Sequence, residues 1–193
     1  MFLLSRPSRG EIESFLSAQR SKPLSYAPVG ITRNLPASGF NIDHNRVRVG
    51  KGPHAFRAAV AAIEAWKMFD IGWAGIFPAD TPVEIGATVA VVVNHMGFWS
   101  MNACRIVYLV EESAGLGRYG FAYGTLADHA ERGEERFTVE WDRRDDSVWY
   151  DILAVSKPGR VARLAYPYSR RLQKRFANDS KKAIMRAVAQ EGV

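Results

Sequence analysis

Two runs of alternating residues, joined by a short charged stretch, constrain this chain more than any other feature. In the first run, residues 119–125, aromatic side chains alternate with glycine and alanine. A period of two puts the rings on one face of a strand and almost nothing on the other. In the second run, residues 134–141, apolar side chains alternate with charged residues and threonine, as in an antiparallel strand with one buried face. We therefore expect a hairpin with a crowded polar loop at 128–136, and a bulge, bend or close backbone approach at the strand glycines.

Further strands and helices follow from the same kind of pattern. Alternation or apolar runs indicate strands at residues 40–49, 72–77, 87–95, 98–111 and 148–155. Helical spacing indicates helices at residues 1–20, 53–69 and 158–190. Ser8 and Glu11 have capping-box spacing in the first helix, and Gly52-Pro53 opens the second. Pro167 is expected to kink the last helix or to restart it at a new first turn. About seven strands with helices before and after them predict an α+β fold, with an antiparallel sheet and helices on one face.

The length of the chain favours one domain. The 193 residues, 47% of them hydrophobic, suffice for one sizeable core, so we expect a single domain over residues 1–193. Within it, residues 1–40 form an N-terminal helix and arm, and 41–157 form the sheet with the inserted helix. Residues 158–190 form a long basic helix.

The composition also indicates a compartment. Cys104 is the only cysteine, so no internal disulfide can form, and a reducing environment is the simplest interpretation. The longest apolar run, residues 87–93, is far shorter than the ~20 residues that span a bilayer. Residues 1–4 are too few for the apolar part of a signal peptide. We expect a soluble, cytoplasmic protein.

The net charge of +6 is concentrated near the C-terminus. Residues 157–186 hold ten basic side chains and one acid, which leaves the rest of the chain with a net charge of −3. Such a segment can meet nucleic acid, an anionic lipid surface or an acidic partner. The alternative, which we favour, is a solvated helix face, because aromatic side chains are not interleaved along it and no nucleic-acid motif is present.

Several longer stretches carry a family resemblance. They are NIDHNRVRVG at 41–50, WKMF at 66–69, GFWSMNACRIVY at 97–108 and YGFAYGT at 119–125, together with residues 129–134, 163–164 and 171–173. Over roughly residues 22–190 the chain resembles uncharacterised protein family 0548, a domain-of-unknown-function family of bacteria and plants. The family has no established activity. The resemblance implies a link to START-like, helix-grip proteins, in which a curved antiparallel sheet grips a long C-terminal helix, often around an apolar cavity.

The strongest polar cluster in the sequence is His129, Glu131 and Glu134. Carboxylates beside a histidine can perform general acid–base chemistry or bind a divalent metal. The alternative is a solvated turn in which the acids pair with Arg132 and Arg136. Strand and loop spacing does not force the three side chains together, so we favour the structural alternative and predict no metal and no cofactor.

A second group of polar candidates lies on two strands. His44 and Arg46 share one strand face and could hold a carboxylate or a phosphate; alternatively they form a salt bridge with the acids of 128–135 or with Asp43. Asn102 and Arg105 interrupt an otherwise apolar strand. A buried arginine must find a partner, so Arg105 is either half of a structural pair or an anchor for a ligand.

Aromatic residues provide the remaining candidates. Six of them could line an apolar pocket, although such residues more often form plain core: Trp99, Phe121, Tyr123, Trp141, Trp149 and Tyr150. Ser100 and Thr125 lack the strand-to-helix turn that presents a nucleophilic serine, so we do not expect covalent catalysis.

These observations lead to one favoured hypothesis and two alternatives. We expect a binding protein that holds a small apolar or amphipathic ligand between the sheet and the long helix. The candidate ligand-binding residues are His44, Arg46, Trp99, Asn102, Arg105, Tyr123, Thr125, His129, Glu131 and Glu134. The first alternative is a hydrolase or isomerase that uses His129 or His44 with Glu131 or Glu134. The second is binding to an anionic surface or nucleic acid through the basic helix.

Overall fold

An antiparallel sheet forms the centre of the molecule. The computed structural model describes the chain except residues 37, 113–115, 130, 159–165 and 192–193. The strand order is β2-β8-β7-β6-β5-β4-β3, and β1 pairs with β5. The strands are β1 (Phe2–Leu3), β2 (Asn41–Lys51), β3 (Ala74–Phe77), β4 (Thr88–Asn94), β5 (Trp99–Glu112), β6 (Leu116–Thr125), β7 (Glu131–Asp142) and β8 (Ser147–Pro158). The predicted curved sheet is confirmed, and only the two-residue β1, too short for a periodic signal, was not expected.

The N-terminal helix α1 (Arg9–Gln19) begins after Ser8, as the capping-box spacing predicts, and not at residue 1. The side chain of Ser8 accepts from the Glu11 N–H, and Glu11 in turn accepts from the Ser8 N–H, which completes a capping box. The inserted helix is shorter than the predicted 53–69: α2 (Gly52–Glu64) stops before Trp66, whose φ of 53° is left-handed, and η1 (Lys67–Phe69) follows as one 3-10 turn. The stop lets Met68 and Phe69 turn into the core.

The C-terminal helix α4 (Tyr166–Gln190) carries Pro167 in its first turn, where a missing N–H is tolerated. This agrees with the restart expected at that proline. The predicted start at residue 158 was wrong, because β8 extends to Pro158; the stretch 159–165 lies outside the described residues. Within the described part of the chain, no helix combines the length and hydrophobicity needed to cross a membrane.

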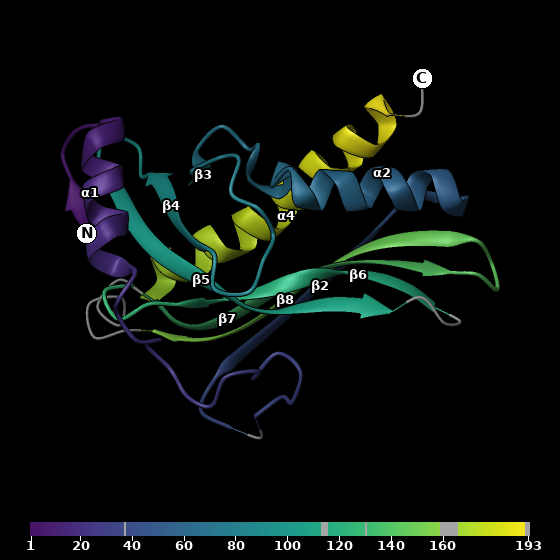
Figure 1. Cartoon of the computed structure of the whole chain (residues 1–193), viewed down its shortest axis with the longest axis horizontal. Helices are drawn as coiled ribbons and strands as arrows, with labels where there is room; N and C mark the ends of the chain where they lie inside the picture. The colour runs from purple at the N-terminus through teal and green to yellow at the C-terminus, as the bar shows by residue number, and fades with distance from the viewer. Residues whose placement is uncertain (37, 113–115, 130, 159–165, 192–193) are drawn as a thin grey trace.

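The sheet is covered on both faces. Figure 1 shows α2 and α4 crossing its concave face, while the segment that follows α1 runs beneath the convex face. The core on the concave face includes Phe121, Phe137 and Tyr150 from the strands. On the convex face this segment, residues 21–40, which we call the arm, packs Tyr26 and Ile31 against β8.

The hairpin at the centre of the sequence adopts the predicted alternation, with two corrections. β7 begins at Glu131, so the loop is shorter than the predicted 128–136. The polar face of β7 is also buried, since Glu134 is 2% exposed and Glu140 is 5% exposed. The glycines of β6 allow the close backbone approach that the sequence predicts. A Cβ at Gly124 would lie 2.3 Å from the Tyr26 hydroxyl of the arm, so only glycine leaves room for this ring.

Candidate functional site

A cavity of about 830 Å³ lies between the concave face of the sheet and the first half of α4. This volume is within the range of small-molecule sites in proteins. Most of its walls are apolar, formed by Phe2, Phe69, Trp73, Val91, Val93, Phe98, Ile152, Leu172 and Phe176.

Small side chains on the floor create the space. At the cavity, the inward positions of β7 and β8 are occupied by Gly133, Ala154 and Ser156. One step further along the same strands, Phe137 and Ile152 pair with each other and fill the core. The large side chains hold α4 away from the sheet, and the small side chains do not fill the space that this separation leaves. The cavity lies in that unfilled space beneath α4.

A row of cross-strand partners places one carboxylate on this floor. Tyr123 pairs with Glu135, Glu135 with Ala154, and Ala154 with Asp43. Asp43 binds Arg170 of α4 through both carboxylate oxygens. Within the described part of the chain, Glu135 receives one hydrogen bond, from the Tyr123 hydroxyl to Oε2 at 2.9 Å. Burial raises the pKa of Glu135 from 4.5 to about 7.

His129 and Glu131, two predicted residues, meet at one end of the cavity. The Glu131 N–H donates to His129 Nδ1 at 3.0 Å, so the neutral ring carries its proton on Nε2. Burial lowers the pKa of His129 to about 4. Burial also raises the pKa of Glu131, and a hydrogen bond with Ser169 and the charge of Arg170 oppose that rise. A neutral imidazole and a carboxylate therefore border the same space.

A hydrogen-bonded chain borders the cavity near β4 and β5, and Asn102 is its one member that the sequence predicted as a ligand-binding residue. Asn102 donates to Ser100 Oγ at 3.0 Å, Ser100 Oγ lies 2.8 Å from His95 Nε2, and His95 Nδ1 lies 3.1 Å from the Tyr168 hydroxyl. Burial lowers the pKa of His95, which favours the neutral ring. The sequence did contain a sign that His95 faces the cavity, because this residue continues the two-residue alternation of Val91 and Val93, which point into it.

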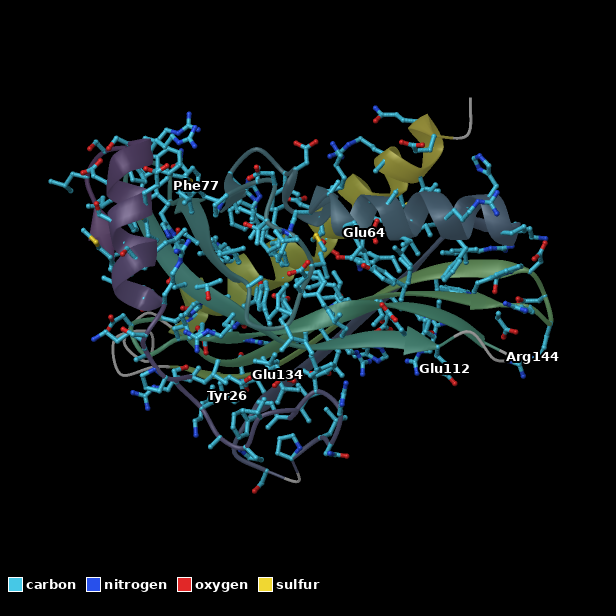
Figure 2. The ribbon with its side chains drawn as sticks, viewed as in Figure 1. Tyr26, Glu64, Phe77, Glu112, Glu134 and Arg144 are labelled. Atoms are coloured by element: carbon cyan, nitrogen blue, oxygen red, sulfur yellow. The ribbon has the colours of Figure 1, made fainter. Side chains whose placement is uncertain are left out.

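Of the remaining expected residues, Tyr123, Thr125 and Glu134 all border the cavity, but the carboxylate of Glu134 faces away from it. That group lies on the convex face, where it accepts from the Tyr26 hydroxyl at 2.7 Å, the Gly30 N–H at 2.9 Å and both the N–H and hydroxyl of Thr32. Figure 2 shows Tyr26 and Glu134 together where the arm meets the sheet.

The side-chain groups of four further expected residues also serve the convex face. His44 borders the cavity, but its imidazole binds the Asp151 carboxylate. Arg46 pairs with Glu140 at 2.8 Å, and Arg105 donates to the backbone carbonyls of residues 20 and 22. The ring of Trp99 lies beneath the guanidinium of Arg6. The sequence grouped these residues because it did not reveal that the arm and α1 cover the second face.

The basic side chains of α4 are partly used within the protein. Four bind internal groups: Arg170 binds Asp43, Arg175 binds Asp179, Lys181 binds Asn45 and Arg186 binds the Asp70 carbonyl. Three others are exposed: Arg171, Lys174 and Lys182. Internal pairing of this kind favours the solvated-face interpretation of the basic helix over an extended anionic contact.

The curved sheet, the gripping C-terminal helix and the cavity between them define a helix-grip, START-like protein. Solved structures with this arrangement include a hypothetical protein from Helicobacter pylori, which is 12% identical with a TM-score of 0.54 over 87% of this chain and 95% of that one. Norcoclaurine synthase from Thalictrum flavum is 11% identical, with a TM-score of 0.50 over 82% of this chain and 99% of that one. Identities this low show a shared fold and nothing more.

The sequence comparisons give the family. Residues 25–183 match the domain of unknown function DUF1990. A UPF0548 protein of Dictyostelium discoideum is 33% identical over 97% of this chain and 96% of its own length. A UPF0548 protein of Arabidopsis thaliana is 38% identical over 80% of this chain and 76% of its own. A third UPF0548 protein, from Deinococcus radiodurans, is 36% identical over 97% of this chain and 98% of its own length. The chain belongs to the UPF0548 family, as the motifs in its sequence indicated.

Proposed function

We propose that this protein binds a small apolar or amphipathic molecule in the cavity between the sheet and α4. The observation that carries the proposal is the cavity itself: about 830 Å³, mostly apolar walls, and a few polar groups gathered on the floor and at the ends. Binding sites for small molecules share this composition, since apolar walls supply affinity and a few polar groups fix orientation.

The first test uses protein purified directly from cells. Native mass spectrometry reports any bound molecule as added mass, and denaturation releases that molecule for identification. We expect a stoichiometric apolar or amphipathic compound, or, if the purified protein is empty, saturable binding of a fluorescent apolar probe. An empty protein that binds no apolar probe would refute the proposal.

A variant that fills the cavity provides the matched structural test. Ala154 lies on the floor, so Ala154→Leu places three additional carbons in the ligand space. We expect probe affinity to fall about tenfold, because the ligand or the wall must yield to accommodate them. Ala189→Leu makes the same change at an exposed position of α4 outside the cavity and serves as the control. Equal affinities for the two variants would place the probe elsewhere.

A second candidate function, an enzyme acting on the same ligand, rests on the presence of His129 and Glu131 on the wall of the same cavity, where the Glu131 backbone N–H fixes the imidazole. A neutral imidazole beside a carboxylate can move a proton to or from a bound molecule. His129→Gln keeps an acceptor for the Glu131 N–H but cannot exchange protons. If the protein is an enzyme, this variant binds ligand normally and loses turnover.

A further inference from the structure

We propose that the ligand of this cavity carries a positively charged nitrogen, as a primary amine or a related organic cation, and that this group docks against Glu135. The inference rests on the proposed function, because it assigns a chemical class to the ligand of the same cavity. It is carried by two independent features of the walls, the balance of charged groups and the placement of aromatic rings.

The charged groups facing the cavity leave a negative excess on its floor. The inward acids are Asp43, Glu131 and Glu135. Arg170 occupies both oxygens of Asp43, and it also opposes the pKa rise of Glu131. Among the described residues, the only donor to Glu135 is the neutral Tyr123 hydroxyl, and no cation reaches its Oε1. Glu135 is only partly exposed, and burial raises its pKa, so a carboxylate in this setting without a cation is stabilised by taking up a proton or by binding a positive ligand.

This local excess is opposite in sign to the charge of the whole chain. The chain carries a net charge of +6, yet among the described residues the only lysine or arginine on the cavity walls is Lys174, which is exposed on α4. A ligand with a carboxylate or phosphate head would meet Glu135 and Glu131 on the floor. A ligand with an ammonium head would neutralise them, and its apolar body would lie along the remaining walls.

Aromatic rings next to Glu135 favour the same class of ligand. Phe69 and Tyr123 lie with ring centroids 6.4 Å apart, and Phe69 and Phe176 lie 5.0 Å apart. All three rings line the cavity, and Tyr123 bonds directly to Glu135. Ring faces attract cations, so a carboxylate bordered by rings is a favourable seat for an ammonium group and a poor one for an anion.

Proton linkage provides a signature of this contact. Glu135 faces Tyr123 of β6, Cys104 of β5, Tyr150 of β8 and Asp43 of β2. From α4, Lys174 lines the cavity and Arg170 pairs with Asp43. Burial raises the pKa of the tyrosines and of the cysteine, so these groups stay neutral near pH 7. Binding of a cation should then expel a proton from Glu135, whose pKa is raised to about 7.

The experiment compares three probes that share one alkyl tail and differ in their heads: decylamine, decanol and decanoate, each below its micelle concentration. Calorimetry on the full chain measures affinity and, in two buffers of different ionisation enthalpy, proton release. We expect decylamine to bind at least about tenfold more tightly than the other two, since it alone neutralises a desolvated carboxylate. Its affinity should fall as the pH drops below about 7, when Glu135 holds its proton.

Two isosteric variants locate the contact. Glu135→Gln removes the charge and should reduce the affinity for decylamine about tenfold or more while leaving decanol within about twofold. Glu84→Gln makes the same change at an exposed position outside the cavity and should leave both unchanged.

The outcomes separate this inference from the proposed function. If none of the three probes binds, the proposed function fails. If decanol or decanoate binds as tightly as decylamine, or if Glu135→Gln leaves decylamine unaffected, the cavity binds ligands but the cationic class is wrong.

Discussion

Glu134 and Glu135 are consecutive residues of β7 that serve opposite faces of the sheet. Glu134 points beneath the arm, where four hydrogen bonds from three residues of the arm reach its carboxylate. Glu135 points into the cavity, where one hydroxyl reaches it. The two side chains have the same chemistry and nearly the same position in the sequence, so the difference between them comes from what covers each face.

This difference separates an acid whose hydrogen bonds the fold supplies from an acid that the proposed ligand would pair with. A buried carboxylate with a full set of donors is satisfied in the folded chain and stabilises it. One with a single neutral donor is costly to ionise, and that cost can be recovered only from a ligand or a proton. The free energy of unfolding and its pH dependence should therefore respond in opposite ways to the same substitution at these two positions.

The largest expected effect comes from Glu134→Gln. The amide keeps the size but loses the charge, and its NH₂ group faces donors of the arm where an oxygen stood. We expect the free energy of unfolding to fall by about 3 kcal/mol, because hydrogen bonds to a buried charge are lost and backbone donors are left without partners. Urea unfolding at pH 7 measures this. A loss no larger than that of Glu135→Gln would remove the distinction between the two faces.

The next effect is a pH dependence that Glu135→Gln should abolish. The pKa of Glu135 is raised in the folded protein from 4.5 to about 7, so the folded state holds the proton more tightly than the unfolded state. Stability is therefore fully present below about pH 4.5 and is lost as the pH rises through 7. At pH 8 the ligand-free variant should be more stable than the wild type by up to about 3 kcal/mol, and at pH 4.5 the two should agree. Parallel stability curves would contradict the buried, unpaired state of Glu135.

His129 should show the opposite slope at the other end of the cavity. Its pKa is lowered in the folded protein from 6.5 to about 4, so its contribution is present above pH 6.5 and is lost as the pH falls towards 4. His129→Gln should remove about 2 kcal/mol of this acid sensitivity, a figure reduced for the partial exposure of the ring. Thermal unfolding between pH 4 and pH 7 measures it. An unchanged acid sensitivity would show that the ring is solvated.

The smallest expected effect tests one donor of the arm. Tyr26→Phe removes the hydroxyl that donates to Glu134 at 2.7 Å and leaves the other donors in place. We expect a loss of about 1 kcal/mol in unfolding free energy, the usual net value of one such bond. Tyr108→Phe, which removes a hydroxyl that contacts Thr32 and not Glu134, is the comparison variant. If Tyr108→Phe lowers the free energy of unfolding more than Tyr26→Phe does, the stabilisation of the arm is not centred on Glu134.

The fold was predictable from the sequence because its elements carry strong local patterns. Alternation in the hairpin gave the strands and their faces, and the spacing around Ser8 and Gly52 gave two helix starts. The errors occurred at boundaries that depend on the tertiary fold. The left-handed Trp66 ends α2 early, and β8 continues to Pro158 because β7 pairs with it there.

The candidate site was only partly predictable, for a physical reason. Alternation assigns residues to faces but does not say which face encloses a cavity, so Tyr123 and His129 were grouped with Arg46 and Glu134 of the other face. The arm has no periodic signal that links it to the convex face. Glu135 was overlooked, although a period of two already placed it on the same face as Phe137.

The back-to-back arrangement of the two glutamates makes β7 sensitive to its length. A shift of this strand by one residue would send Glu134 into the cavity and Glu135 beneath the arm. All remaining side chains of β7 would likewise move to the opposite face of the sheet. Single substitutions at Glu135 or Ala154 change the cavity without touching the convex face. Ligand preference on this scaffold can therefore change by substitution, but not by insertion or deletion within β7.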